Sequence, residues 1–457
     1  MFVMTRRLPL AVVALAVVVV LAGCPAPAGP STPPGDPNTD DPITGPPTPP
    51  EETPTDDGIG ESRQVTVNGS LSVNATQIYQ RVEQLMDVNA SAPDVRVERM
   101  NRSSSVGLAP SPVRQALGFA NTTGSVQACD AFTSAYATDG SVTISPVNPV
   151  TGENLSASTI ELVLVHEYAH TLQNRVEGFR NATAAGNLHI SQAMTEGSAV
   201  FVTDTYAQRH DVRWSGKRPM EVRKCVYKQT RGMRKLVNGD YYYGGQYFSQ
   251  RIDEPSALST AIETVPNTTE QLIHGETPAS EPVAPLSVTV DESESFNHRD
   301  SPALVGFPTG ELSLRTWLSE GLSADRVDTA ATGWGNAHVA TFRDGTGNVS
   351  LAWTVRWDAP GEADEFGAAL ADLVPTLENR TGTHLRHVRV APETVVVFGG
   401  NQSFVADATA TGTNGNVTVA VPGPKPDDGT NVPPDGNNSN LPSVGGSETT
   451  TTAADAD

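Results

Sequence analysis

His166, Glu167 and His170 lie in one short stretch of the 457-residue chain, which reads IELVLVHEYAHTL over residues 160–172. On a helix, residues four apart share a face, so the two imidazoles can bind one Zn²⁺ ion. Glu167 is adjacent and can take a proton from a water molecule on that ion. The apolar flanks predict a buried helix, and buried polar side chains need partners such as a metal. The motif therefore predicts peptide hydrolysis with Glu167 as general base.

A third protein ligand decides the class of this site, because a catalytic zinc keeps one coordination position open. Gln173 and Val176 stand where metzincins have Gly and His, which excludes that class. The later segment TEGSAVFV places Glu196 on a following helix, where its carboxylate can complete a His₂Glu site. Gly197 is expected to let that helix approach the first helix closely. Alternative third ligands are His189 and Asp204.

Four segments together resemble the gluzincin metallopeptidases: HEYAH, the later TEGSA, YYYGGQYF and TTEQLIHGE. More closely, the set is similar to a family of secreted haloarchaeal surface lipoproteins that carry HExxH. The resemblance covers roughly residues 125–276, and residues 333–366 look like the second unit of those surface proteins. It implies that His166, His170 and Glu196 bind zinc and that Glu167 is the general base. It also implies that a hairpin at 135–145 supplies the edge strand that aligns a peptide substrate.

The sequence departs from the gluzincin pattern in two places. Glu196 follows His170 by 26 residues, a longer interval than in the best-known members, and Val200 stands where an acid usually orients a ligand histidine. That orienting partner must come from elsewhere. No single residue is identified as the transition-state stabiliser, for which the candidates are Tyr206, His210, Tyr242 and Tyr243. The alternative function is therefore a surface or adhesion lipoprotein with an inactive zinc domain.

The N-terminus predicts export. Arg6 and Arg7 precede an apolar run over residues 8–21, and Leu-Ala-Gly-Cys at 21–24 resembles a lipobox. Cys24 is the expected lipidation site, which would anchor the protein to the outer face of the cytoplasmic membrane after Tat or Sec export. The alternatives are ordinary cleavage and an uncleaved anchor. Thirteen N-x-[ST] sequons suit a surface glycoprotein.

The net charge of −22, with only five lysines among 30 basic residues, favours a protein that functions in strong salt. Such an acidic chain is not a general nucleic-acid binder. Residues 209–235 are the exception, since ten Arg and Lys there face only Asp211 and Glu221. This segment either docks to an acidic surface glycoprotein or is a solvated region paired with acids elsewhere.

Cys129 and Cys225 can form one disulfide in an exported protein, and two isolated buried thiols are the alternative.

Composition divides the chain into six parts and predicts an α+β fold. The expected parts are a signal peptide (1–23), a disordered lipid-anchored linker (24–63), a mainly helical gluzincin-like domain with a small sheet (64–276), a linker (277–300), a small α+β domain (301–420) and a disordered tail (421–457).

Overall fold

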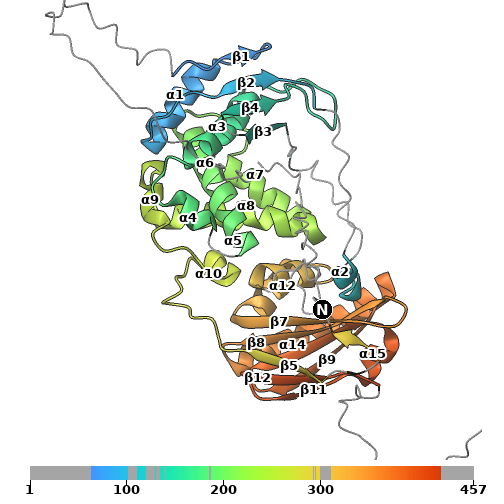
Figure 1. Ribbon diagram of the computed structural model, residues 1–457. Helices are drawn as coiled ribbons and strands as arrows, with labels where there is room; N and C mark the ends of the chain where they lie inside the picture. The colour runs from blue at the N-terminus through green and yellow to red at the C-terminus, as the bar shows by residue number, and fades with distance from the viewer. Residues whose placement is uncertain are drawn as a thin grey trace, which may run out of the picture.

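The structure is a computed structural model that describes residues 63–100, 111–119, 129, 134–138, 140–184, 187–291, 293, 295–298 and 310–423. The predicted signal peptide, Cys24 with nearly all of the linker after it, and the tail from residue 424 lie outside these residues. The described chain mixes helices with three small sheets, as expected for an α+β protein (Figure 1). Within this part of the chain, no helix is long and apolar enough to cross a membrane.

A four-stranded sheet forms one end of the molecule, in the order β1-β2-β4-β3 (Figure 1). Its strands are β1 (Val67–Asn68), β2 (Asp94–Val97), β3 (Ala135–Thr138) and β4 (Ser141–Ile144). The hairpin predicted at 135–145 is confirmed, because β3 and β4 pair antiparallel around Gly140. Gly140 has a φ of +75°, which glycine adopts without steric cost. In this sheet β3 is an edge strand.

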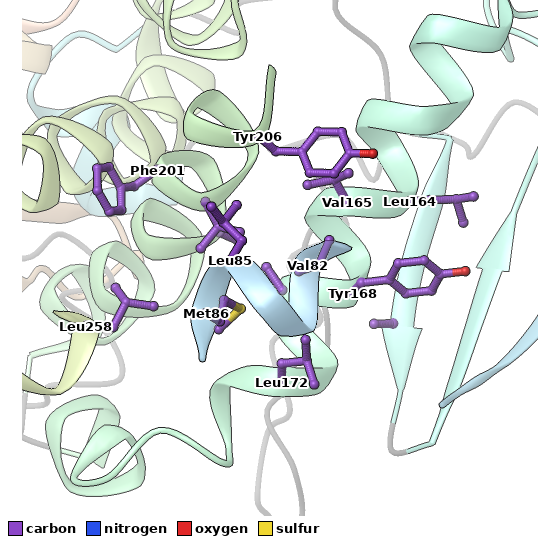
Figure 2. Packing of buried hydrophobic residues seen from close by; sticks show 14 of the residues in the cluster. Val82, Leu85, Met86, Leu164, Val165, Tyr168, Leu172, Phe201, Tyr206 and Leu258 are labelled. Carbon is purple, nitrogen blue, oxygen red and sulfur yellow. The ribbon is translucent and has the colours of Figure 1, made fainter. Parts of the chain in front are cut away.

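Helix α3 (Ala157–Gln173) runs through the centre of the first unit. Its apolar residues surround the helix instead of forming a stripe, which is typical of a fully buried helix. It packs against α1 (Ala75–Met86) and α6 (Ser198–Arg209). Figure 2 shows Val82 and Leu85 of α1 beside Val165, Tyr168 and other core residues. The Ser156 hydroxyl caps α3 by accepting from the Thr159 N–H at 3.1 Å.

The remaining helices of the first unit enclose α3 and α6. They are α4 (Phe179–Ala184), α5 (Leu188–Gln192), the π-helix η3 (Ala193–Gly197), α7 (Pro219–Gln229), α8 (Gly232–Arg251), the 3₁₀ helix η4 (Pro255–Ala257), α9 (Leu258–Ala261) and α10 (Thr269–His274). The local sequence pattern alone indicates a helix only over residues 243–252, which is the second half of α8. Sequence pattern missed the first half because its apolar and charged residues do not separate into clear faces.

A five-stranded antiparallel sheet forms the second unit, in the order β6-β7-β8-β10-β9. Its strands are β6 (Asn297–His298), β7 (Trp334–Arg343), β8 (Val349–Trp357), β9 (His384–Ala391) and β10 (Thr394–Gly400). Strand residues alternate between two cores, as the pleat requires. Trp353 and Val397 face one core with α12 (Glu311–Leu318), α13 (Ala324–Ala331) and α14 (Pro360–Thr381), whereas Ala352 and Phe398 face the other.

A three-stranded sheet, in the order β11-β12-β5, packs on that other face together with α15 (Gln402–Asp407). It consists of β11 (Thr409–Gly412), β12 (Asn416–Ala420) and β5 (Ser287–Asp291). Residues 277–300, expected to be a linker, thus contribute β5 and β6 to the second unit. Alternate valines of β5 are packed against this core, which the Pro- and Ser-rich composition had obscured.

Helix α2 (Pro112–Ala116) also departs from the expected division of the chain. It belongs by sequence to the first unit but packs in the core of the second, beside α12 and β8 (Figure 1). The Trp317 indole donates to the Leu117 carbonyl at 2.8 Å, and Thr383 donates to the Ala116 carbonyl at 3.2 Å. A segment that lies between β2 and β3 of the first unit therefore belongs to the core of the second unit.

Candidate metal site

His166, His170 and Glu196 meet in a buried group that could hold a metal ion. The Nε2 atoms of the two histidines are 3.2 Å apart, and each lies 3.3 Å from Oε2 of Glu196. The three ligand atoms therefore form a nearly equilateral triangle. The neighbouring Glu167 is also buried, with 5% of its surface exposed. Of the residues predicted from sequence, the structure brings these three ligands together beside Glu167.

Gln173 orients His170, and it comes from the same helix one turn later. The Gln173 amide nitrogen donates to the Thr195 carbonyl at 2.6 Å and to Ser198 Oγ at 2.8 Å. These bonds turn the amide oxygen toward His170 Nδ1, 3.0 Å away. Nδ1 consequently carries the hydrogen, and the lone pair of Nε2 points into the triangle. Sequence analysis used Gln173 only to exclude a protein class and missed this role.

The electrostatics of the triangle favour a neutral His166 beside an ionised Glu196. Burial lowers the pKa of His166 to about 4, so its imidazole is a free base at neutral pH. Burial alone would raise the pKa of Glu196, but the two histidines hold it below its ordinary value. Deprotonated ligands are what metal binding requires. The lone pair of His166 and the carboxylate of Glu196 thus face one buried point.

Glu196 projects from the π-helix η3, a local widening often found at functional sites. The expected role of Gly197 needs correction, because its close neighbour is α8 and not α3. A Cβ at Gly197 would come within 2.4 Å of the Gly244 backbone, and one at Gly244 within 2.5 Å of the Ala193 carbonyl oxygen. The paired glycines let η3 and α8 touch, which fixes the helical segment that carries Glu196.

Both alternative third ligands have other partners. His189 Nδ1 lies 2.8 Å from Asp240 Oδ1 in a buried pair. Asp204 accepts from the Arg218 guanidinium and from the Met220 N–H. Neither alternative belongs to the group that could hold a metal among the described residues. Glu196 is therefore the acid that the fold directs to the histidines.

Tyr241 is the aromatic residue that stacks on the site. Its ring lies 6.4 Å from the His166 ring with an interplanar angle of 20°, and the Arg223 guanidinium lies 4.4 Å above the Tyr241 ring. The Arg223 charge also helps to lower the pKa of His166, after burial and the charge of His170. Sequence analysis missed both residues. The rotation of α8 about its axis decides which of its three consecutive tyrosines faces the site, and this is Tyr241. The sequence does not reveal this rotation because the full length of the helix is not evident from it.

The candidate stabilisers chosen from sequence lie in other surroundings. Tyr206 donates to Glu161 Oε1 at 2.7 Å, and the His210 ring lies against the Tyr206 ring. Tyr242 stacks on Tyr227, and Tyr243 donates to the Tyr227 hydroxyl in the same aromatic cluster. These partners of the four residues all lie outside the triangle.

The basic segment 209–235 folds as the end of α6, a loop, α7 and the start of α8. Arg209 pairs with Glu254, Arg213 with Asp211 and Arg218 with Asp204. Three cations of the segment are thus paired with acids, and one of these acids, Asp211, belongs to the segment itself. A disulfide joins Cys129 to Cys225 on α7, beside the buried Val222 and Val226. It links α7, the helix that carries Arg223, to a segment 96 residues earlier.

Comparison with known proteins covers the second unit. Residues 307–433 match a family described as "Domain of unknown function (DUF8575)". No curated protein matches the chain. The function must therefore be argued from the chemistry of the site.

Proposed function

We propose that the first unit is a zinc-dependent peptide hydrolase of the gluzincin type. The observation that carries this proposal is the triangle of His166 Nε2, His170 Nε2 and Glu196 Oε2, with sides of 3.2–3.3 Å. Tetrahedral zinc binds nitrogen and oxygen at about 2.0–2.1 Å, which places neighbouring ligand atoms about 3.3 Å apart. Three protein ligands would leave the fourth position open for water or substrate.

Zinc bound in this triangle would acidify a water molecule and polarise the scissile carbonyl. Glu167 would take the proton from water and return it to the leaving amine. Its position next to His166 on α3, in a largely buried site, suits this role. Gln173 would keep His170 in the tautomer that binds metal, because its amide oxygen accepts the Nδ1 hydrogen.

Substrate binding is assigned to two further elements. Strand β3 is an edge strand that contacts α3, so it could align an extended peptide beside the catalytic helix. Tyr136 on β3 leaves 40% of its surface exposed, as expected for a side chain that receives a ligand. Arg223 and Tyr241 replace Tyr206 and Tyr242 as our candidates for stabilising the developing oxyanion.

The resemblance of HEYAH and TEGSA to gluzincins supports the same assignment. We further propose that the enzyme acts on peptides or proteins at the cell surface, held by a lipid at Cys24, because the N-terminal segment reads as an export signal with a lipobox.

Peptide cleavage by the zinc-loaded protein in concentrated salt tests the proposal. A mixed peptide library should be cleaved by the wild-type protein, and Glu167→Gln should lower the rate by at least about a hundredfold without loss of zinc. Glu177→Gln is the matched control, because Glu177 is an exposed acid just beyond α3. Equal rates for Glu167→Gln and wild type would reject the enzyme. Stoichiometric zinc without any cleavage would favour the inactive surface lipoprotein instead.

A further inference from the structure

A second group of acids lies between the two units, away from the triangle. It consists of Glu270 on α10, Glu281 in the segment before β5 and Asp358 just after β8. One carboxylate oxygen from each residue lies within 4.8 Å of one from each of the others. Two nearby segments and one distant segment of the chain thus direct negative charge toward one point.

Glu270 is the unusual member of this acidic cluster. Only 6% of its surface is exposed, and no described residue donates a hydrogen bond or a positive charge to its carboxylate. A buried carboxylate without a partner is strongly disfavoured, so it must either take up a proton or bind a cation. Burial, followed by the charges of Glu311, Asp358 and Glu281, raises the pKa of Glu270 to about 9.

The cations near the cluster have other acids as partners, although the charge of Arg356 also acts on Asp358. Arg315 and His274 pair with Glu311, and Arg356 binds Glu393 and the Pro285 carbonyl. The acids themselves are held in place by the fold. Gln271 donates to the Glu281 carbonyl at 2.7 Å, which fixes that segment against α10.

Glycine makes room for the third acid. A Cβ at Gly335 would come within 2.5 Å of Asp358 Oδ1, so any other residue there would displace the carboxylate. Gly335 lies on β7, beside the end of β8 that leads to Asp358.

We propose that Glu270, Glu281 and Asp358 form a calcium site that joins α10 to the second unit. All the ligand atoms are oxygens, which hard cations prefer. Ca²⁺ binds oxygen at 2.3–2.6 Å, so ligands on opposite sides of the ion can be about 5 Å apart. Mg²⁺ binds at 2.0–2.1 Å and would require separations below about 4.2 Å. Mg²⁺ also demands near-ideal octahedral geometry and is seldom held by protein carboxylates alone, so a cluster of three carboxylates favours calcium.

Bound calcium would neutralise the cluster and tie together residues 270, 281 and 358. This would stabilise the contact of α10 and α12 with β8 and the segment before β5. The site acts on the docking of the two units and is independent of zinc and of peptide cleavage.

Calcium alone is the probe for the test, added to the full, zinc-loaded chain in buffer depleted of calcium on a chelating resin. Saturating calcium should raise the thermal midpoint by about 5 °C, and magnesium should raise it less. Isothermal titration of the wild-type chain should show about one calcium more per chain than titration of the double variant Glu270→Gln/Asp358→Asn. This difference in heat belongs to the proposed site.

The variants separate calcium binding from a general effect on folding. Glu270→Gln replaces an acid that must take up a proton to be buried, so it should stabilise the calcium-free protein and abolish the calcium increment. Glu281→Gln changes a half-buried acid and should also weaken calcium binding. It replaces the double variant in the test if the double variant does not fold. The matched controls Glu263→Gln and Asp325→Asn change exposed acids outside the cluster and should keep the full increment.

Two results would overturn the calcium site. If calcium shifts neither the midpoint nor the heat of the wild-type chain, the three acids merely share protons. If the shift persists in both Glu270→Gln/Asp358→Asn and Glu281→Gln, calcium binds elsewhere on the acidic surface.

Discussion

If the triangle binds zinc as proposed, Gln173→Met should weaken that binding although Gln173 is not one of the three proposed ligands. Methionine has a similar length and volume but accepts no strong hydrogen bond, so the buried Nδ1–H of His170 would lose its acceptor at 3.0 Å. The His170 ring could then rotate or change tautomer, and Nε2 would no longer be held toward Glu196. Loss of such an orienting partner typically costs 10- to 100-fold in metal affinity, or about 1.4–2.7 kcal/mol.

The assay is competition for zinc against a chromophoric chelator in concentrated salt. Gln229→Met is the matched control, because Gln229 is exposed at the end of α7. Gln173 also anchors Thr195 and Ser198, so the unfolding free energy of the metal-free variant should be measured in parallel. Ser198→Ala removes one anchor of the amide while leaving its oxygen near His170, and it should cost less affinity than Gln173→Met. An affinity within about twofold of wild type for Gln173→Met would refute the orienting role.

Three other predictions follow from the geometry. Arg223→Met should lower kcat/KM for peptides by about a hundredfold while the zinc content stays full. The control Lys224→Met changes an exposed neighbour and should leave kcat/KM unchanged. Equal effects of the two substitutions would reject Arg223 as a stabiliser of the oxyanion. Gly197→Ala should lower the unfolding free energy by about 1–3 kcal/mol, since its Cβ would meet Gly244 at 2.4 Å. By contrast, Gly367→Ala meets nothing within 4 Å and should gain up to about 1 kcal/mol in denaturant unfolding, so equal changes would contradict the close approach. Finally, the pKa of Glu270 is raised from 4.5 to about 9 in the folded chain, so between these pH values the folded chain binds a proton that the unfolded chain has lost. The free energy of unfolding without calcium should therefore fall as the pH rises from 4.5 to about 9. Unfolding curves at a series of pH values should show a flatter profile for Glu270→Gln, and an identical profile would remove Glu270 as the cause.

The sequence determined the chemistry of the metal group and much of the local structure. His166 and His170 are four residues apart inside an apolar run, so a buried helix places both imidazoles on one face. Likewise the alternation around Gly140 predicted the hairpin at 135–145, which is confirmed. These features depend on neighbours in the chain, for which helix and strand periodicity is sufficient information.

Tertiary structure alone decided which distant residues complete the site. Glu196, His189 and Asp204 were all acceptable ligands by type, and only packing of η3 against α8 directs Glu196 to the histidines. The choice of Tyr241 depends on the phase of a 20-residue helix with no clear apolar stripe.

The composition of the second unit likewise depends on contacts between segments far apart in the chain. Strand β5 was hidden in a Pro-rich segment, and α2 packs about 200 residues away along the chain, where Trp317 binds the Leu117 carbonyl. The composition of a segment shows how much apolar surface it has to bury. It does not show which other segment covers that surface. The physical reason is that ligand convergence and domain boundaries depend on contacts between segments far apart in sequence, which local periodicity does not encode.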